Sequence, residues 1–492
     1  MAKRFAIPAL LSTALLLTAV LFVLAGCGGS GGPIGQPPTP APSISAAFLA
    51  LLPAGQTGAT YVGASQCLTC HSTKQGDAEP IDATHWNDTK HAQLSIGCEQ
   101  CHGPASLHVA NPSEDNILTF PKITRAEVCG QCHGDRYTQF ETSPHAQYVE
   151  EEIEVTTPSK NCFRCHSGSF RTEMIDAKLA AGETPAQIDT EINALTNDQM
   201  LAYANDPTTH KGGTKETEPC AGCHDPHRKT GNLLVNVDQT TEELQLRRPS
   251  FSLDTTNIQP GTTPANYTTV NHMCGCCHNS RGGGNTDAYL AVNTTRKSFH
   301  NGHQFNMLLG QGGYEPSPPP VRQAAHASIP SQCTKCHLAA GSHTFTVSID
   351  QSCNPCHTPQ DAQARMAIRG TNQLRLYNIL SRLQLWAKNT FGDPNVWDYT
   401  ANIVPPSVKP NQNLIPPQIK GVRHNYWYVL VDASFGIHNA DYTAYLLNVC
   451  DQLLDQVPGT RAVVPKPTAQ QLAAFVRKER ERDRRAAMTE RE

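Results

Sequence analysis

Apolar residues follow the helical repeat in two stretches, both in the last quarter of the chain. The first stretch has them at Leu376, Ile379, Leu380, Leu383 and Ala387. The second has them at Tyr442, Leu446, Val449 and Leu453. Because this spacing places side chains on one face of a helix, we predict two amphipathic helices that pack back on the rest of the molecule.

The polar pattern around these helices predicts a cap, a crossover and a tail. Asn439 stands where its side chain can cap the second helix, and His438 beside it can reach inward. The Pro-rich stretch 403–418 predicts a crossover between the two helices. Beyond Pro458 the chain predicts a linker and a solvated helix of mixed charge.

Helix formers also fill residues 173–205, but Gly182 and Pro185 interrupt them. This stretch predicts two short helices in a solvated spacer. Elsewhere the 35 Gly and 36 Pro residues indicate loops and single helical turns. Hydrophobic residues make up 38% and aromatic residues 6% of the chain, less than a well-packed core usually provides. Something other than side chains is therefore expected to fill the interior.

The N-terminus predicts export. Lys3 and Arg4 precede an apolar run from Ala9 to Leu24 that ends in LAGC, which is the layout of a secretory signal. It resembles a bacterial lipoprotein signal, and the resemblance implies that Cys27 is acylated as the first residue of the mature protein. A transmembrane anchor is the alternative, but this run is short for a bilayer span.

The Gly/Pro-rich stretch that follows, 27–60, predicts a tether. Gly28 stands where lipoproteins of this kind often carry an Asp that retains them in the inner membrane. The resemblance therefore implies an exported outer-membrane lipoprotein, on the periplasmic face or the cell surface.

Charge excludes some functions, and composition suggests another. Charged residues make up 17% of the chain and the formal net charge is -4, which argues against a disordered chain and against a nucleic-acid binder. The 19 cysteines and 21 histidines are the outliers. They indicate a metal or cofactor protein.

The motif Cys-x-x-Cys-His occurs eight times. Its cysteine pairs are Cys67 and Cys70, Cys98 and Cys101, Cys129 and Cys132, Cys162 and Cys165, Cys220 and Cys223, Cys274 and Cys277, Cys333 and Cys336, and Cys353 and Cys356. Its histidines are His71, His102, His133, His166, His224, His278, His337 and His357. At this spacing both thiols reach one porphyrin edge as thioethers, and the next imidazole lies beneath the iron as the proximal ligand. Eight covalently bound haem c groups are predicted.

Other cysteine chemistries explain the repeat less well. Zinc pairs do not require the following His, thioredoxin-like sites do not repeat, and a disulfide framework leaves the His unexplained. Two cysteines, Cys276 inside the sixth motif and Cys450, remain over. We predict that each is a free or buried thiol, with a disulfide between them as the alternative.

The second axial ligand must come from elsewhere in the chain. Thirteen histidines lie outside the motifs: His85, His91, His108, His145, His210, His227, His272, His300, His303, His326, His343, His424 and His438. Methionine, the other common axial ligand, occurs only 7 times. Most haems are therefore predicted to have two histidine ligands and low potentials.

Several stretches resemble the multihaem c-type cytochromes of anaerobic metal-reducing bacteria, and the likeness covers residues 61–457. These stretches are TKHAQLSIGCEQCHGPASLH (89–108), CAGCHDPH (220–227), NHMCGCCHNSRGG, NMLLGQGGYE (306–315), GSHTF (341–345) and DASFGIHNADYTAYLLN (432–448). The resemblance implies extracytoplasmic electron conduits. It also implies distal iron ligands at His91, His108, His227, His343 and His438.

Three further distal ligands complete the set. His145 and His326 have the same local surroundings as the first five, and His300 is the eighth, with His303 as its rival. His85, His210, His272 and His424 remain over.

These observations predict an octahaem c-type cytochrome that carries single electrons outside the cytoplasm, with no catalytic residues. Its partners would be other cytochromes or an outer-membrane conduit, mineral or other extracellular acceptors, and further copies of itself. One alternative is an octahaem reductase of a small nitrogen or sulfur oxyanion at an open haem. Several such enzymes replace one proximal His by Lys, whereas all eight motifs here end in His. A polymeric cytochrome filament is the other alternative, against which a lipid anchor argues.

The predicted fold is mainly α with extensive coil, a multihaem cytochrome c fold with the haems as its core and a C-terminal pair of helices. The predicted division is a lipoprotein signal peptide (1–26), a tether (27–60), an N-terminal tetrahaem region (61–168), a helical haem-free insertion (169–219), a C-terminal tetrahaem region (220–360), a helical segment packing on haems (361–457) and a charged tail (458–492).

Overall fold

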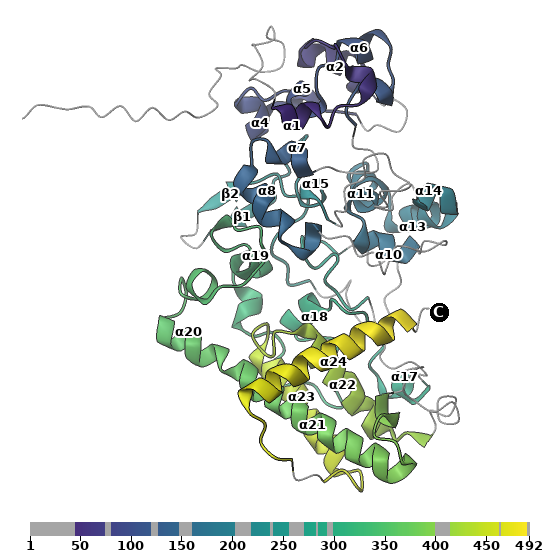
Figure 1. Ribbon diagram of the computed structural model, residues 1–492, viewed down its shortest axis with the longest axis vertical. Coiled ribbons are helices and arrows are strands. Elements are labelled where there is room, and N and C mark those ends of the chain that lie inside the picture. Colours follow the sequence, from purple (N-terminus) through teal and green to yellow (C-terminus); the bar gives the residue numbers. More distant parts are fainter. Residues whose placement is uncertain are drawn as a thin grey trace, which may run out of the picture.

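The computed structural model describes most of the chain between residues 45 and 489. The described ranges are 45–73, 80–119, 126–146, 160–201, 218–236, 240–254, 270–281, 284–292, 299–398, 414–461 and 464–489. The predicted signal peptide, Cys27, His210 and most of the Pro-rich stretch 403–418 lie outside them. Within these ranges the fold is mainly α-helical with extensive coil, as the sequence predicts. The molecule is elongated, with the first helices at one end and the C-terminal helices at the other (Figure 1).

Short helices joined by loops make up the chain before residue 367. They are α1 (Ala46–Leu49), α2 (Ala64–His71), α3 (Ala83–Asn87), α4 (Lys90–Gln93), α5 (Glu99–His102), α6 (Ser106–Ala110), α7 (Ala126–Gly130), α8 (Gly134–Glu141), α10 (Lys160–His166), α11 (Gly168–Arg171), α12 (Lys178–Ala180), α13 (Pro185–Ala194), α14 (Asn197–Leu201), α15 (Cys220–Cys223), α17 (Asp287–Val292), α18 (Gln304–Leu308), α19 (Gln332–His337) and α20 (Pro359–Met366). One small antiparallel sheet joins β1 (Leu233–Val235) to β2 (Thr241–Glu243).

Single turns of other helix types connect these elements. They are η1 (Ala54–Gln56), η2 (Glu114–Asn116), η3 (Pro144–Ala146), η4 (Thr172–Ala177), η6 (Ala325–Ser328), η7 (Ala339–Gly341), η8 (Ile349–Cys353) and η9 (Val396–Asp398). Local sequence explains why the helices are short. Helix α5, for example, stops at His102 because Gly103 takes a positive φ of 77°, a conformation that glycine adopts without steric cost.

Apolar clusters in the first two thirds of the molecule are small. One contains Phe48, Leu118 and Val128. Another contains Val270, Cys276, Phe305, Leu308, Leu309 and Ala327. Clusters of this size bury little apolar surface, which agrees with the prediction that side chains alone do not fill this part of the interior.

The stretch 173–205 contains the break predicted at Gly182, where φ is 88°. Helix α13 then starts at Pro185, with a capping box between Thr184 and Gln187. The predicted solvated spacer is wrong, because this region has a packed core of its own. The core comprises Phe163, Phe170, Met174, Ile175, Ile188, Ile192 and Met200.

The C-terminal block holds the large apolar core of the molecule. Its helices are α21 (Ile368–Phe391), α22 (Pro417–Asp432), α23 (Ala440–Asp455) and α24 (Ala469–Thr489). The two predicted amphipathic helices are α21 and α23, and the apolar positions named from the sequence are buried in both. The side chain of Asn439 accepts a hydrogen bond from the Tyr442 amide at 3.0 Å, so the predicted cap of α23 is confirmed.

Helix α22 was not predicted. It lies between α21 and α23 and packs on both, and almost every one of its side chains is buried. Burial on all sides leaves no polar face, so its sequence carries no helical period to detect. The C-terminal helices therefore form a bundle around α22, in place of the predicted pair.

The charged tail also differs from the expectation. Helix α24 lies across α21 and α22 (Figure 1), and its face at Phe475, Glu479 and Asp483 is buried. The predicted fully solvated helix is wrong, because these residues stand four apart and form one stripe that packs on the block.

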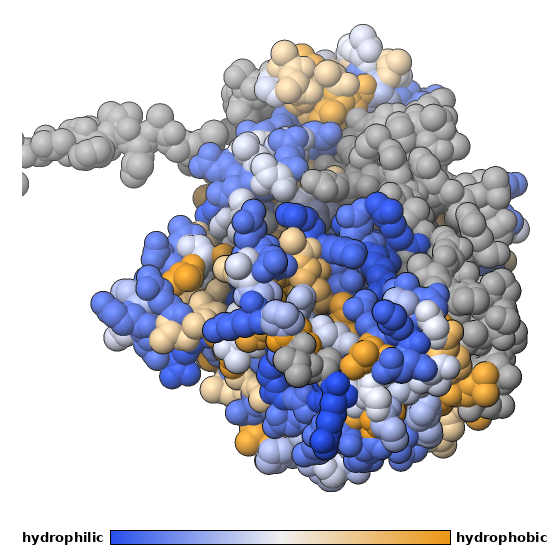
Figure 2. Space-filling model, turned by 60° about the horizontal axis from the view of Figure 1, so that its bottom comes forward, coloured by the Kyte–Doolittle hydropathy of each residue, from blue (hydrophilic) through white to orange (hydrophobic). Residues whose placement is uncertain are grey.

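No helix among the described residues is long and apolar enough to span a membrane. Figure 2 views the end of the molecule that the C-terminal block forms, where a largely hydrophilic surface is interrupted by small apolar patches.

Candidate haem-binding sites

Each Cys-x-x-Cys-His motif is built on a short turn of backbone. In five of them the histidine N–H donates to the carbonyl of the first cysteine at 2.8–2.9 Å: His102, His133, His224, His278 and His357. A helical turn of this kind puts residues three positions apart on the same side. The two thiols of one motif are therefore presented together, with the imidazole next to them.

The structure brings each motif histidine beside one of the eight histidines predicted as distal ligands. The ring-centroid distances are 6.3 Å for His71 and His108, 6.2 Å for His133 and His91, 6.2 Å for His102 and His227, 6.1 Å for His278 and His145, 6.2 Å for His166 and His300, 6.4 Å for His224 and His343, 6.3 Å for His357 and His326, and 6.3 Å for His337 and His438. Each of these sixteen histidines occurs once in the eight pairs.

This separation fits two imidazoles bound to opposite sides of one metal. A metal–imidazole bond is about 2 Å long and the ring centre lies about 1 Å behind its nitrogen, so two such rings have centroids about 6 Å apart. Rings in direct contact, such as those of His303 and Tyr428, lie closer, at 4.0 Å. The gap between paired rings has room for one metal ion and the plane of a macrocycle.

The Nδ1 atoms of most paired histidines face hydrogen-bond acceptors. The carbonyl oxygen of Leu118 lies 2.7 Å from Nδ1 of His102, and that of Ile437 lies 2.7 Å from Nδ1 of His326. The same atom has an acceptor in His108, His224, His278, His300, His337, His343, His357 and His438. A proton on Nδ1 leaves the lone pair on Nε2, the atom needed for a metal, and holds the ring in orientation.

Three histidines outside these eight pairs use Nε2 in the protein itself. In His272, His303 and His424 this atom lies 2.8–3.0 Å from the carbonyl oxygens of Ser250, Tyr428 and Gly312, respectively. All three are buried, so they are structural histidines of the core. His303, the rival of His300, therefore has its Nε2 committed to α22. His85, which also lies outside the eight pairs, is exposed beside Asp82.

Burial keeps several paired rings neutral. Desolvation lowers the pKa of His145 to about 4, and it also lowers the pKa of His102 and His224. A neutral imidazole is the form that binds a metal. These three rings are thus in the metal-binding form at neutral pH.

Two paired histidines have carboxylate neighbours instead of carbonyls. Nδ1 of His438 lies 2.7 Å from Oδ1 of Asp432, which is only 3% exposed. Nδ1 of His357 lies 2.8 Å from Oδ2 of the more exposed Asp361. Neither carboxylate was predicted from the sequence. The spacing of Asp361 four residues after His357 is a detectable signal, whereas the Asp432 contact depends on the turn between α22 and α23.

Two buried arginines near the fourth and sixth motifs have N–H groups without an acceptor among the described residues. Arg171 and Arg248 share the carboxylate of Asp176. Nη2 of Arg171 and Nε of Arg248 are buried without a hydrogen-bond partner among the described residues. Buried donors of this kind need an acceptor, and the propionate carboxylates of a haem are suitable ones.

The leftover thiols are not joined. Cys276 and Cys450 are both free and buried, and they belong to separate apolar clusters. The alternative of a disulfide between them is wrong. His272, Cys274 and Cys333 come within 4.8 Å of one another. They do not form a separate metal site, because both ring nitrogens of His272 are hydrogen-bonded to backbone and the cysteines belong to two motifs.

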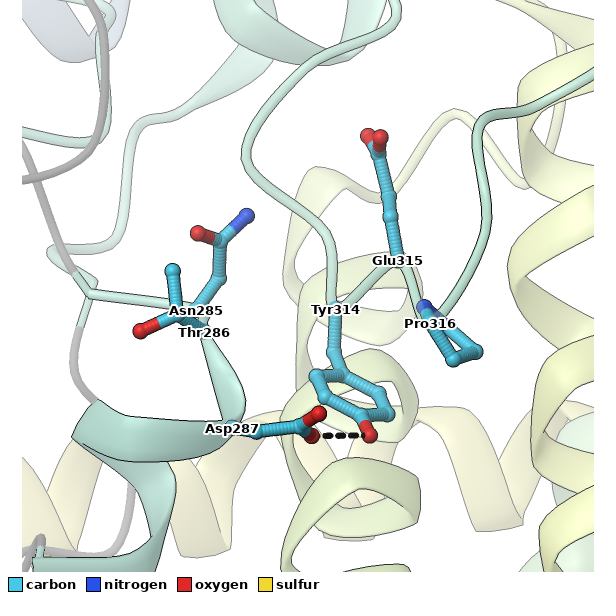
Figure 3. Close-up of a pocket in the computed structure, with 6 residues that line it drawn as sticks. All are labelled: Asn285, Thr286, Asp287, Tyr314, Glu315 and Pro316. Carbon is cyan, nitrogen blue, oxygen red and sulfur yellow. Dashed lines mark hydrogen bonds between the residues drawn. The ribbon is translucent and has the colours of Figure 1, made fainter.

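A hollow of about 320 Å³ lies beside the C-terminal block, where α17 packs on α22. Its lining is Asn285, Thr286, Asp287, Tyr314, Glu315 and Pro316, and the Tyr314 hydroxyl donates to Asp287 at 2.5 Å (Figure 3). Neither a motif cysteine nor a paired histidine lines it. The hollow is therefore not part of the candidate sites.

Two family models match the first part of the chain. Residues 81–167 match the family of cytochrome c7 and related cytochrome c, and residues 53–103 match cytochrome c554 and c-prime. This part of the chain is therefore similar to c-type cytochromes. The matched residues, 53–167 together, contain the first four Cys-x-x-Cys-His motifs.

Two solved structures are similar to the chain. The undecaheme cytochrome from the S-layer of Carboxydothermus ferrireducens has 22% sequence identity and a TM-score of 0.47, with 74% of this chain and 50% of that chain covered. The outer cell wall cytochrome OcwA has 20% identity and a TM-score of 0.44, with 73% of this chain and 70% of that chain covered. The chain thus spans half the length of the undecaheme cytochrome. No curated protein matches it.

Proposed function

We propose that this chain is an octahaem c-type cytochrome that carries single electrons. In this proposal the sixteen motif cysteines form thioethers, each motif histidine is a proximal ligand and its partner is the distal ligand. The eight histidine pairs at 6.1–6.4 Å carry the proposal. Haem c held there would supply a one-electron iron couple, which the axial nitrogens and the burial tune.

Contacts between motif cysteines support a continuous electron path. The sulfur atoms of different motifs are direct neighbours in four places: Cys67 with Cys98, Cys129 with Cys220, Cys165 with Cys277, and Cys274 with Cys333. The remaining links are electrostatic neighbours: Cys101 with Cys129, Cys223 with Cys274, and Cys336 with Cys353. Helix packing agrees, since α7 packs on α15 and α19 packs on η8.

These contacts connect all eight motifs. Numbered along the chain, they follow the order 1, 2, 3, 5, 6, 7, 8, and motif 4 branches from motif 6. Cofactors attached to neighbouring sulfurs would have adjacent edges, so the chain's own cysteines would fix a route along the long axis of the molecule. Cysteines from distant parts of the sequence would thus set the distances between haems that electron transfer requires.

The reductase alternative has less support from this structure. Such an enzyme needs an iron that lacks a distal ligand, yet every motif histidine here has a histidine partner. The filament alternative has no observation in its favour. For location we propose an exported outer-membrane lipoprotein anchored through Cys27, from the layout of the N-terminus. Other cytochromes, an outer-membrane conduit or an extracellular acceptor would exchange electrons with it.

The proposal is tested on purified protein from a host that matures c-type cytochromes. We expect the intact mass to exceed that of the chain by eight haems, and electron paramagnetic resonance of the oxidised protein to show only low-spin iron. Carbon monoxide should not bind the reduced protein. A mass equal to the bare chain would refute the proposal, and a high-spin iron that binds carbon monoxide would favour the reductase.

A further inference from the structure

His300 occupies a loop, unlike its partner. It lies between α17 and α18, whereas His166 ends α10, a helix with a packed core around it. A ligand on a loop keeps its position only if neighbouring elements hold the loop. The contacts of Phe299 and Asn301, which flank His300, show what holds it.

On one side the loop is anchored to α22. Phe299 is buried, with ring centroids 5.2 Å from His424 and 4.9 Å from Tyr428. His303, at the other end of the loop, stacks on Tyr428 at 4.0 Å. These contacts hold Phe299, directly before His300, and His303, three residues after it, but they leave the residue directly after His300 to be held by another element.

On the other side the loop is anchored to α24. The side-chain amide of Asn301 donates to Oδ2 of Asp483 at 2.7 Å. Asp483 is only 2% exposed, and it is the last member of the buried stripe that begins at Phe475. In Figure 1 the C-terminal half of α24 points from the block towards the middle of the molecule.

This contact differs from an ordinary surface interaction. A buried carboxylate is costly unless hydrogen bonds satisfy it, so Asp483 favours a loop position in which Asn301 reaches it. Arg485 and Glu481 on the same helix form an exposed ion pair instead. Exposed pairs of that kind contribute little to stability. The helix thus offers a matched control for its own buried contact.

We propose that the hydrogen bond between Asn301 and Asp483 positions His300, so that α24 keeps the distal side of the fourth site closed. The inference rests on the proposed function, because it assigns His300 as an axial ligand. Asn301 and Asp483 are positioning residues that do not touch the metal. When the bond is broken, the loop relaxes and the fourth site gains an open coordination position. This site is also the branch of the cysteine path, so it can open without interrupting the main route.

The test compares full-length, haem-loaded variants. In Asp483→Ala and Asn301→Ala we expect one iron in eight to become high-spin by electron paramagnetic resonance, with about one carbon monoxide bound per reduced protein. Asp483→Asn, which keeps an acceptor oxygen, should remain largely low-spin. Arg485→Ala should match the wild type. Asn301→Ala leaves the buried stripe of α24 intact, so it separates positioning from loss of helix packing.

The outcomes are distinct. Eight low-spin irons and no carbon monoxide binding in both alanine variants would overturn the inference and leave the proposed function standing. A wild type in which the iron of the fourth site is already high-spin would also overturn it, because His300 would then not be bound. A wild type without covalent haem would remove the proposed function and the inference together.

Discussion

At the scale of single residues, the groups that accept a hydrogen bond from the paired histidines differ in charge from site to site. Seven paired rings face a backbone carbonyl, which is neutral, whereas His438 faces the buried carboxylate of Asp432. A carboxylate hydrogen-bonded to a ligating imidazole raises the basicity of the ligand. More basic nitrogen stabilises ferric over ferrous iron, so the seventh site should have a lowered potential.

Replacing Asp432 by Asn should therefore raise the potential of the seventh site. The expected rise is about 60–120 mV, the equivalent of a 10- to 100-fold change for a one-electron couple. Spectroelectrochemical titration of the variant and the wild type measures it. Asp361→Asn is the control beside the eighth site, where the carboxylate is 41% exposed and solvent should reduce the effect. Equal shifts in the two variants would contradict the argument from burial.

Residue patterns found the motif cysteines and the candidate histidines because the information is local. Five consecutive residues are enough to attach a haem, and HGPxxxH or CHDPH can be read without a structure. The acceptors at Nδ1 were missed because backbone carbonyls such as that of Leu118 have no sequence signature.

At the scale of elements, the C-terminal block supplies the stability that the small clusters elsewhere do not. Leu446 on α23 is fully buried in its core. The prediction of α21 and α23 succeeded because each has one apolar face and one polar face. Prediction of α22 failed because it is surrounded, and prediction of α24 as solvated failed because its buried stripe consists largely of acidic residues.

Truncation of Leu446 to Ala should lower the free energy of unfolding by about 2–5 kcal/mol, the usual loss for a buried leucine. Leu414→Ala, at a side chain that is 52% exposed, should change it by less than about 0.5 kcal/mol. Denaturant unfolding followed by circular dichroism measures both. Similar values for the two variants would show that the block is not a cooperative core.

At the scale of the whole molecule, the order of sites departs from the order of motifs. Site 3 touches site 5, and site 4 is linked to site 6. Among the described cysteine contacts, the fifth motif joins the first three sites to the rest.

Removal of the fifth attachment site should therefore interrupt the path. In Cys220→Ala/Cys223→Ala we expect seven haems and much slower electron equilibration between the two ends of the molecule, measured by rapid mixing with a reductant. Cys162→Ala/Cys165→Ala removes the branch at site 4 and should leave equilibration close to that of the wild type. Equal slowing in both variants would contradict the branched order.

The sequence by itself determined where the eight motifs lie, which histidines are candidates for the second ligand, and that the fold is mainly helical. Each of these features can be recognised from a short stretch of sequence, because its chemistry or its periodicity involves only neighbouring residues. Only the tertiary structure decided the pairing, in which partners stand 31 residues apart in His326 and His357 but 134 apart in His166 and His300. Contact between distant segments depends on how all the intervening elements pack, and no local pattern contains that information.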